Sequence, residues 1–299
     1  FENLPDMKSI DIFAEHKGNY SLNDKVFNAH QKCANGNDKM VYYVASRFNL
    51  PKNFKDMVYL SQVTQNECIA DATEHWRRNK GRCNGSMYWQ LNDCWGVCSW
   101  SSIDYYGNYK ALQYGARHFN APVSVSIENT EEYIKLFVLN DLKEKQDVTV
   151  TYDIFDFVSG TKQSDKKDVS IDAVKNELVF ELDVKSLAKA YDLKRTGVAV
   201  KLFKDGELLQ QKTVLFDKEK KLDLPKAKLK TRIEIKEDRL DITVKSDAYA
   251  RLVKLESADS VLPFSDNFFD ILPNESKKVT IYKDSSMSLR KLAESITVY

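Results

Sequence analysis

The stretch GRCNGSMYWQLNDCWG, residues 81–96, marks the change of structure on which the fold prediction rests. It is preceded by residues 58–80, whose apolar positions can share one face of a long amphipathic helix. Within the stretch, glycines end that helix, residues 86–91 form a short apolar strand, and residues 92–96 leave the strand as a polar loop. Residues 109–119 then have a helical pattern again. This order of helix, strand, loop and helix is typical of a βα repeat in a parallel α/β fold.

Only one or two such repeats fit between the first residue and Pro122. A closed (β/α)8 barrel takes about 250 residues, so this block is too short to be a whole barrel. Upstream of the repeat, residues 5–14 are predicted to form a helix with Pro5 in its first turn. The chain begins with Phe1 and has no initiator Met or signal peptide, so we expect a truncated or processed end.

The remainder of the chain alternates apolar and polar residues between turn signals, which is typical of half-buried antiparallel strands. Residues 197–216 contain two strands around Asp205-Gly206, a pair that suits a two-residue hairpin because both residues need positive φ. A Lys-rich connector separates two alternating blocks, and we predict two immunoglobulin-like β-sandwiches, residues 120–224 and 225–299. The other expected strands are residues 123–127, 133–139, 147–157, 177–184, 231–236, 239–245, 250–257 and 277–282.

The overall charge argues against two classes of partner. Lys+Arg 45 against Asp+Glu 44 leaves a net charge of +1, which gives no general attraction to nucleic acid or to an anionic membrane. No apolar run approaches the roughly 20 residues that a membrane-spanning helix requires. We therefore expect neither nucleic acid nor a membrane as a partner.

The five cysteines are odd in number and all lie in the first third of the chain. A disulfide framework of a secreted protein would be distributed differently, so we expect reduced thiols and a cytoplasmic protein. Two sequons, at Asn19 and Asn274, keep a lysosomal or secreted origin open. The spacing of the cysteines does not match a zinc ribbon, and neither a metal site nor a cofactor is predicted. The five are Cys33, Cys68, Cys83, Cys94 and Cys98.

Two segments of the first block, ATEHWRRNK (residues 72–80) and MYWQLNDCWGVCSWSSIDYYG (residues 87–107), closely resemble the β-mannosidase branch of glycoside hydrolase family 2. In that branch the last barrel strand carries a YWQLND signature, followed by a WPxxSW loop and a helix with Lys-Ala near its start, as from Lys110. The chain departs from the pattern with Gly96, where the family usually has Pro. Near the other end, FSDNFFDILP (residues 264–273) resembles the hallmark of the family's final β-sandwich.

The resemblance implies that residues 1–119 are the last portion of the catalytic (β/α)8 (TIM) barrel, an α/β unit followed by the two β-sandwiches. Phe1–Pro5 resembles the residues just after the family's nucleophile, which lies in a Glu-aromatic-Gly-Phe run. On this basis the nucleophile lies a few positions before Phe1 and the acid/base farther upstream, so the chain holds no catalytic residue. A retaining hydrolysis needs two carboxyl groups about 5–5.5 Å apart. We therefore expect the fragment alone to be inactive.

Four residues of the signature loop are expected to contact substrate. The family places a Trp of the sugar subsite at the position of Trp89, whose indole can stack on a sugar ring; the alternative is a core Trp between barrel and helices. Asn92 and Asp93 are expected to position the sugar, through hydrogen bonds to it or to neighbouring loops, with simple loop capping as the alternative. Trp95 is expected to line the outer part of the cleft.

The implied function is that of a C-terminal fragment of a retaining exo-β-mannosidase, which hydrolyses terminal β-D-mannosyl residues. Its partners would be a β-mannoside or manno-oligosaccharide substrate and the missing N-terminal part of its own chain. Two alternatives stay open: a non-catalytic carbohydrate-binding or scaffolding module, and a family relative that acts on another β-glycoside, since a fold does not fix a substrate.

Overall fold

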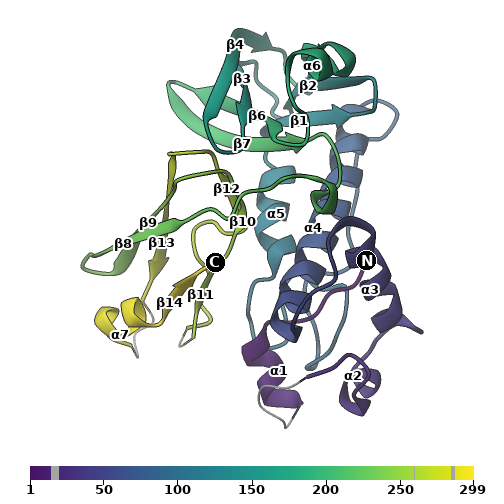
Figure 1. Cartoon of the computed structure of the whole chain (residues 1–299), viewed down its shortest axis with the longest axis vertical. Helices are drawn as coiled ribbons and strands as arrows, with labels where there is room; N and C mark the ends of the chain where they lie inside the picture. The colour runs from purple at the N-terminus through teal and green to yellow at the C-terminus, as the bar shows by residue number, and fades with distance from the viewer. Residues whose placement is uncertain (15–19, 259, 284–286) are drawn as a thin grey trace.

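The computed structural model of the chain describes residues 1–14, 20–258, 260–283 and 287–299, so the sequon at Asn19 lies outside the described residues. Residues 1–119, whose described residues form only helices and loops, are called the helical part. The two groups of antiparallel sheets that follow in the chain are called the first and the second sandwich (Figure 1). The helices of the helical part are α1 (Met7–Phe13), α2 (Lys25–Ala29), α3 (Gly36–Arg47), α4 (Phe54–Arg78) and α5 (Ala111–Phe119).

The long helix α4 organises the helical part. The side chain of its N-cap, Asn53, accepts a hydrogen bond from the Asp56 amide at 2.8 Å, which satisfies one of the free donors of the first turn. Helix α5 packs along α4. The first residues of the chain also pack against α4, through a core that includes Leu4 and Ile10. The helices predicted at residues 5–14, 58–80 and 109–119 are confirmed as α1, α4 and α5.

The strand predicted at residues 86–91 is not formed. Among the described residues, the helical part contains isolated bridges, such as Asn3 with Ser99, but no strand of a sheet. A parallel strand is held by backbone hydrogen bonds to neighbouring strands, and residues 86–91 have only a loop beside them, where the Gln90 amide donates to the Trp100 carbonyl at 3.3 Å. The barrel portion predicted for residues 1–119 is therefore not evident in the structure.

The first group of sheets encloses its core between a three-stranded sheet, β1-β2-β5, and a four-stranded sheet, β4-β3-β6-β7. The β6–β7 hairpin turns at Asp205 and Gly206 with φ of 52° and 80°, as predicted. Strand β4 was not predicted, because this polar, mostly exposed edge strand lacks an alternating pattern. The elements are β1 (Val123–Asn129), β2 (Tyr133–Asn140), β3 (Gln146–Asp156), β4 (Gly160–Ile171), β5 (Lys175–Asp183), α6 (Val184–Ala190), β6 (Thr196–Lys204) and β7 (Glu207–Leu215).

The second group of sheets follows a short helix, η1 (Glu219–Lys221), and has the orders β13-β9-β8, β10-β12 and β11-β14. The single strand predicted at residues 250–257 is divided into β10 and β11, since Leu252 has a φ of 52° and Lys254 lies between the two strands. The elements are β8 (Leu229–Ile235), β9 (Arg239–Ser246), β10 (Ala250–Val253), β11 (Leu255–Ser257), β12 (Phe269–Ile271), β13 (Ser276–Tyr282), α7 (Leu289–Glu294) and β14 (Ile296–Val298).

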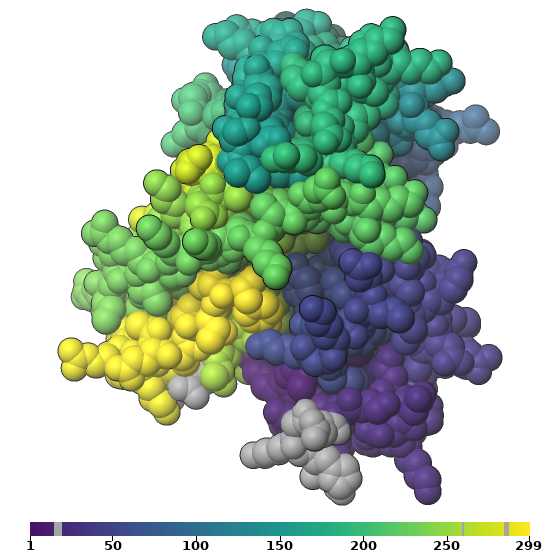
Figure 2. Space-filling model, in the orientation of Figure 1, coloured from purple at the N-terminus to yellow at the C-terminus, as the bar shows by residue number. Residues whose placement is uncertain are grey.

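The three parts of the molecule surround a hollow of about 1040 Å³, which opens in the middle of the face shown in Figure 2. Ion pairs cross between the parts on its wall. Arg251 pairs with Glu67 of α4 at 2.5 Å and with Glu219 of η1 at 2.9 Å, and Arg47 of α3 reaches the same Glu219 carboxylate at 2.6 Å. These contacts join the second group of sheets to the helical part.

Candidate functional site

Trp89 lies in the segment of residues 86–91 and presents its indole to solvent. Its side chain is 73% exposed, and its neighbours at alternating positions, Met87 and Leu91, are exposed as well. The peptide bond between Trp89 and Gln90 is cis. Burying apolar side chains is the main favourable term in folding, so an exposed row of this kind is free to contact something outside the chain. Within this structure Trp89 is not a core residue.

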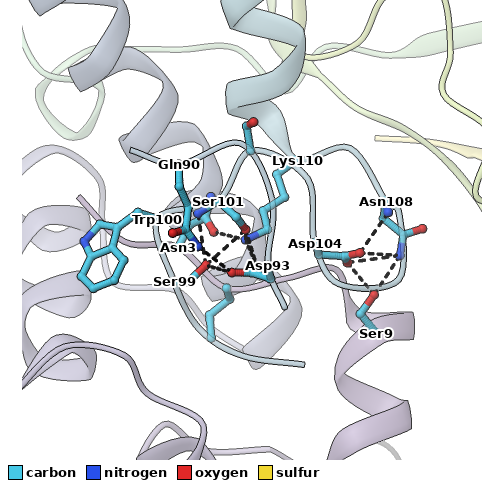
Figure 3. Close-up of polar contacts among 12 residues, drawn as sticks. Asn3, Ser9, Gln90, Asp93, Ser99, Trp100, Ser101, Asp104, Asn108 and Lys110 are labelled. Carbon is cyan, nitrogen blue, oxygen red and sulfur yellow. Dashed lines mark hydrogen bonds and ion pairs between the residues drawn. The ribbon is translucent and has the colours of Figure 1, made fainter. Parts of the chain in front are cut away.

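Asp93, four residues later, is directed into the protein (Figure 3). Its carboxylate is 2% exposed and accepts hydrogen bonds from the hydroxyls of Ser99 at 2.6 Å and Ser101 at 2.5 Å. The Gln90 amide group donates to it at 3.1 Å. All three partners belong to the same loop. Of the roles expected for Asp93, the hydrogen bonds to neighbouring loop residues are the ones that the structure contains.

Lys110, at the N-cap of α5, brings a buried cation to this network. Its Nζ lies 3.8 Å from the Asp93 carboxylate and donates to Ser101 Oγ at 2.7 Å and to Asn3 Oδ1 at 2.8 Å. Burial lowers the pKa of Lys110, because it disfavours the charged form, and the negative charge of Asp93 opposes that shift. The sequence did not single out Lys110 as a site residue, since a lysine just before a helix is usually exposed.

Asn3 connects the loop to the beginning of the chain and to α4. Its backbone pairs with that of Ser99 through hydrogen bonds of 2.9 and 3.3 Å. Its side-chain amide donates to Gln65 Oε1 of α4 at 2.5 Å, and the Gln65 amide in turn donates to the Trp100 carbonyl at 2.8 Å. The loop that follows Trp89 is thus held against residues 1–4 by main-chain and side-chain contacts.

A second polar network, separate from the first in Figure 3, is centred on Asp104. Its carboxylate accepts from the Ser9 hydroxyl at 2.6 Å and from the Asn108 backbone amide at 2.9 Å. The Asn108 side chain closes the network by donating to Ser9 Oγ at 2.8 Å. This network fixes α1 to the turn before α5. The sequence signal for it is the Asp-x-x-Gly-Asn order, which is typical of a side-chain-stabilised turn.

Trp95 forms the rim of the same loop, and Asn92 is exposed beside it. The Trp95 ring is 36% exposed and stacks on His30 with ring centroids 4.5 Å apart. The opposite face of His30 stacks on Phe13 at 4.7 Å, and the Lys32 ammonium lies 5.0 Å from the Trp95 ring centroid. The structure therefore leaves three of the four predicted substrate contacts, Trp89, Asn92 and Trp95, accessible, and buries Asp93.

Several other ionisable groups of the helical part are buried. Glu2 is buried, and burial raises the pKa of its carboxyl to about 7. All five cysteines are free thiols; burial raises the pKa of Cys98 to about 12 and that of Cys68 to about 11. In the described ranges, no three His, Cys, Asp or Glu side chains are grouped so that they could hold a metal ion. The helices described here also include none long and apolar enough to cross a bilayer.

Comparison with known proteins shows which families this chain resembles. The family described as a Mannosidase Ig/CBM-like domain matches residues 132–221, and an Ig-fold domain of the mannosidase type matches residues 224–299. The β-mannosidase of Bos taurus is 30% identical over 289 residues, which is 90% of this chain and 33% of that protein. The chain is homologous to β-mannosidases. The two groups of sheets are accordingly immunoglobulin-like, as predicted.

The solved structures agree with this homology. The β-D-mannosidase from Dictyoglomus thermophilum superposes with a TM-score of 0.90 at 26% identity, over 100% of this chain and 36% of that one. An exo-chitosanase from Amycolatopsis orientalis has the same fold, with a TM-score of 0.74 at 15% identity over 100% of this chain and 40% of that one. The chain spans about a third of the length of the β-mannosidases that it matches.

Proposed function

We propose that this chain is the C-terminal fragment of a retaining exo-β-mannosidase and supplies one wall of its sugar pocket. The observation that carries the proposal is the exposed indole of Trp89 inside the MYWQLND signature, in a chain homologous to β-mannosidases. Trp89 would stack on the apolar face of a terminal β-D-mannosyl ring, because an aromatic face complements the C–H face of a sugar. Asn92 and Trp95 would line the pocket beside it.

In this proposal the reacting carboxyl groups come from the part of the protein outside these 299 residues. Retention requires a nucleophile and an acid/base about 5–5.5 Å apart. The two acidic residues that follow Trp89 in the signature segment, Asp93 and Asp104, are buried and engaged in internal hydrogen bonds. Neither is available for attack at an anomeric carbon. Asp93 would act on the substrate only through the loop that it holds.

The remaining partner would be the N-terminal portion of the same protein. Residues 1–119 would complete a (β/α)8 barrel with it, so that residues 86–91 gain the strand neighbours that they lack here. Some of the exposed apolar side chains of this part, such as Met87, Leu91 and Tyr42, would then be covered. The domain boundaries near residues 119 and 224 and a cytoplasmic location, with a lysosomal or secreted origin as the alternative, stay predictions.

The carbohydrate-binding or scaffolding alternative would be favoured by exposed rows of aromatic side chains on a sheet. Phe155 and Phe157 of the first sandwich are instead fully buried and pack against Tyr249. We therefore prefer the glycosidase. A relative specific for another β-glycoside would share the fold, as the exo-chitosanase does.

The experiment that tests the proposal compares residues 1–299 with the full-length protein on aryl β-mannosides. We expect hydrolysis by the full-length protein with release of β-mannose as the first product, and no turnover by the fragment. Turnover by a fragment preparation free of the full-length protein would contradict the proposal. Preferential hydrolysis of β-glucosides or β-glucosaminides by the full-length protein would identify a relative with another specificity.

A further inference from the structure

Lys110 is a lysine whose charge is fully removed from solvent. Its side chain has 0% exposure, and its three neighbours within reach are the Asp93 carboxylate, the Ser101 hydroxyl and the Asn3 side-chain oxygen. Burying an ammonium group is costly unless it is paired and hydrogen-bonded. An apolar side chain of similar length would fill the same space without that cost. We therefore expect the charge of Lys110 to contribute something other than packing.

The three partners of Lys110 belong to two segments that are far apart in sequence. Asn3 lies 107 residues before it, in the first residues of the chain, whereas Asp93 and Ser101 belong to the loop that follows Trp89. The same two segments pair their backbones at Asn3 and Ser99. The ammonium group is therefore a single point at which both segments are fixed.

We propose that Lys110 is a positioning residue of the sugar pocket, whose buried ammonium group fixes the loop of residues 93–101, and with it Trp89, against residues 1–4. The inference rests on the proposed function and on the expectation from the sequence resemblance that the nucleophile lies a few positions before Phe1. Lys110 touches neither sugar nor nucleophile. Its effect is to set the distance between the Trp89 wall and the nucleophile wall, and misplacing such groups by an ångström can be expensive in rate.

Lys212 offers a matched control in the same chain. Its ammonium group is also paired with one carboxylate, that of Glu74, and donates to the Val125 carbonyl at 2.7 Å. These contacts join α4 to β1 and β7, away from the Trp89 loop. Replacing either lysine by Met removes a buried charge and leaves a carboxylate without its cation, but only Lys110→Met disturbs the two pocket segments.

The test uses the full-length protein with Lys110→Met and Lys212→Met. We expect Lys110→Met to lower kcat/KM on an aryl β-mannoside at least tenfold per folded molecule, and Lys212→Met to leave it within twofold. Hydrogen exchange measured by mass spectrometry should accelerate in peptides that contain residues 1–6 and 88–104 for Lys110→Met alone. A purely structural role would lower the melting temperature of both variants and would not produce this difference.

If Lys110→Met does not fold, Asn3→Asp provides the second variant, because it keeps an acceptor for the ammonium group but removes the amide that donates to Gln65, and Asn3→Ala, which removes both contacts, is compared with it. Asn3→Ala should show the same changes of kcat/KM and of exchange, to a smaller extent than Lys110→Met and to a larger extent than Asn3→Asp. Normal kcat/KM and normal exchange in folded Asn3→Ala would overturn the inference. An inactive wild-type protein would contradict the proposed function instead, while the exchange measurement would still decide whether Lys110 fixes the two segments.

Discussion

The sandwiches and the helical part differ in what holds their extended segments in place. In the first sandwich each strand is paired with one or two others of the same hundred residues, and apolar side chains of both sheets fill the space between them. In the helical part no strand among the described residues lies beside the extended residues 86–91, and the loop that follows is held by buried polar groups, Asp93, Lys110 and Asp104. The strands of the first sandwich therefore find their partners within the sandwich, whereas the loop of the helical part depends on buried polar contacts.

The largest effect that follows from this contrast is expected in the first sandwich. Phe155 of β3 is fully buried in a core that the first sandwich shares with Tyr249 and Leu272 of the second, so Phe155→Ala should leave a cavity that costs about 3–5 kcal/mol of stability. We expect a clear fall in melting temperature, while kcat/KM of the folded full-length variant stays normal. A loss below about 1 kcal/mol would show that the sandwich core adapts more freely than its packing indicates.

The opposite pattern is expected at Trp89. Trp89→Ala removes an exposed indole, so the melting temperature should change little. In the full-length protein kcat/KM on aryl β-mannosides should fall at least about tenfold, because losing roughly 1.4 kcal/mol of transition-state stabilisation has that effect. Both quantities are measured on one preparation. A large stability loss with unchanged kcat/KM per folded molecule would end the stacking proposal and remove the contrast with Phe155.

A smaller effect is expected where the two parts meet at Asp266. Burial alone would raise the pKa of this carboxyl, but the hydrogen bonds from His118 of α5 and Lys277 of β13 outweigh it and lower the pKa to about 2. Because the folded pKa lies below the ordinary value of 3.8, the contribution to stability is complete above about pH 4 and is lost as the pH falls toward 2.

Asp266→Asn should therefore lower the free energy of unfolding by about 1–2 kcal/mol at pH 6 and by progressively less as the pH falls toward 2. Thermal melts of both proteins between pH 2 and 7 check this. The exposed carboxylate of Glu207 provides the control, and Glu207→Gln should have little effect at any of these pH values. An Asp266→Asn difference that does not shrink with acid would mean that packing, and not charge, holds this contact.

Most of the sandwich strands were predictable, because hairpin-connected strands carry their signals locally. The alternation at residues 133–139 and the Asp205-Gly206 turn need no knowledge of distant residues. The edge strand β4 was missed because most of its residues are polar and exposed, and only Val169 and Ile171 near its end are buried. The division at Lys254 was missed because the alternating pattern continues through residues 250–257 and gives no sign of the positive φ of Leu252.

In the candidate site, too, local sequence signals were readable and contacts between distant residues were not. Trp89, Asn92 and Trp95 were singled out because the signature is a continuous run, and the structure leaves them accessible, while their contact with a sugar stays a prediction. The contact set of Lys110 was not predictable, since its acceptor Asn3 is 107 residues away and a lone lysine carries no pattern. The strand at residues 86–91 was wrongly predicted because its apolar pattern describes a propensity, while a strand also requires a neighbour.

The positions of the cysteines allow local opening of the helical part to be measured by thiol reactivity. All five thiols lie in the helical part, and Cys98 is fully buried beside the Asn3–Ser99 pairing with a pKa raised by burial to about 12. Alkylating reagents attack the thiolate, so Cys98 is shielded both sterically and by its protonation state. Pulsed alkylation followed at Cys98 would therefore record the opening of the structure around the Trp89 loop, because the other four thiols are exposed or partly exposed and react without it.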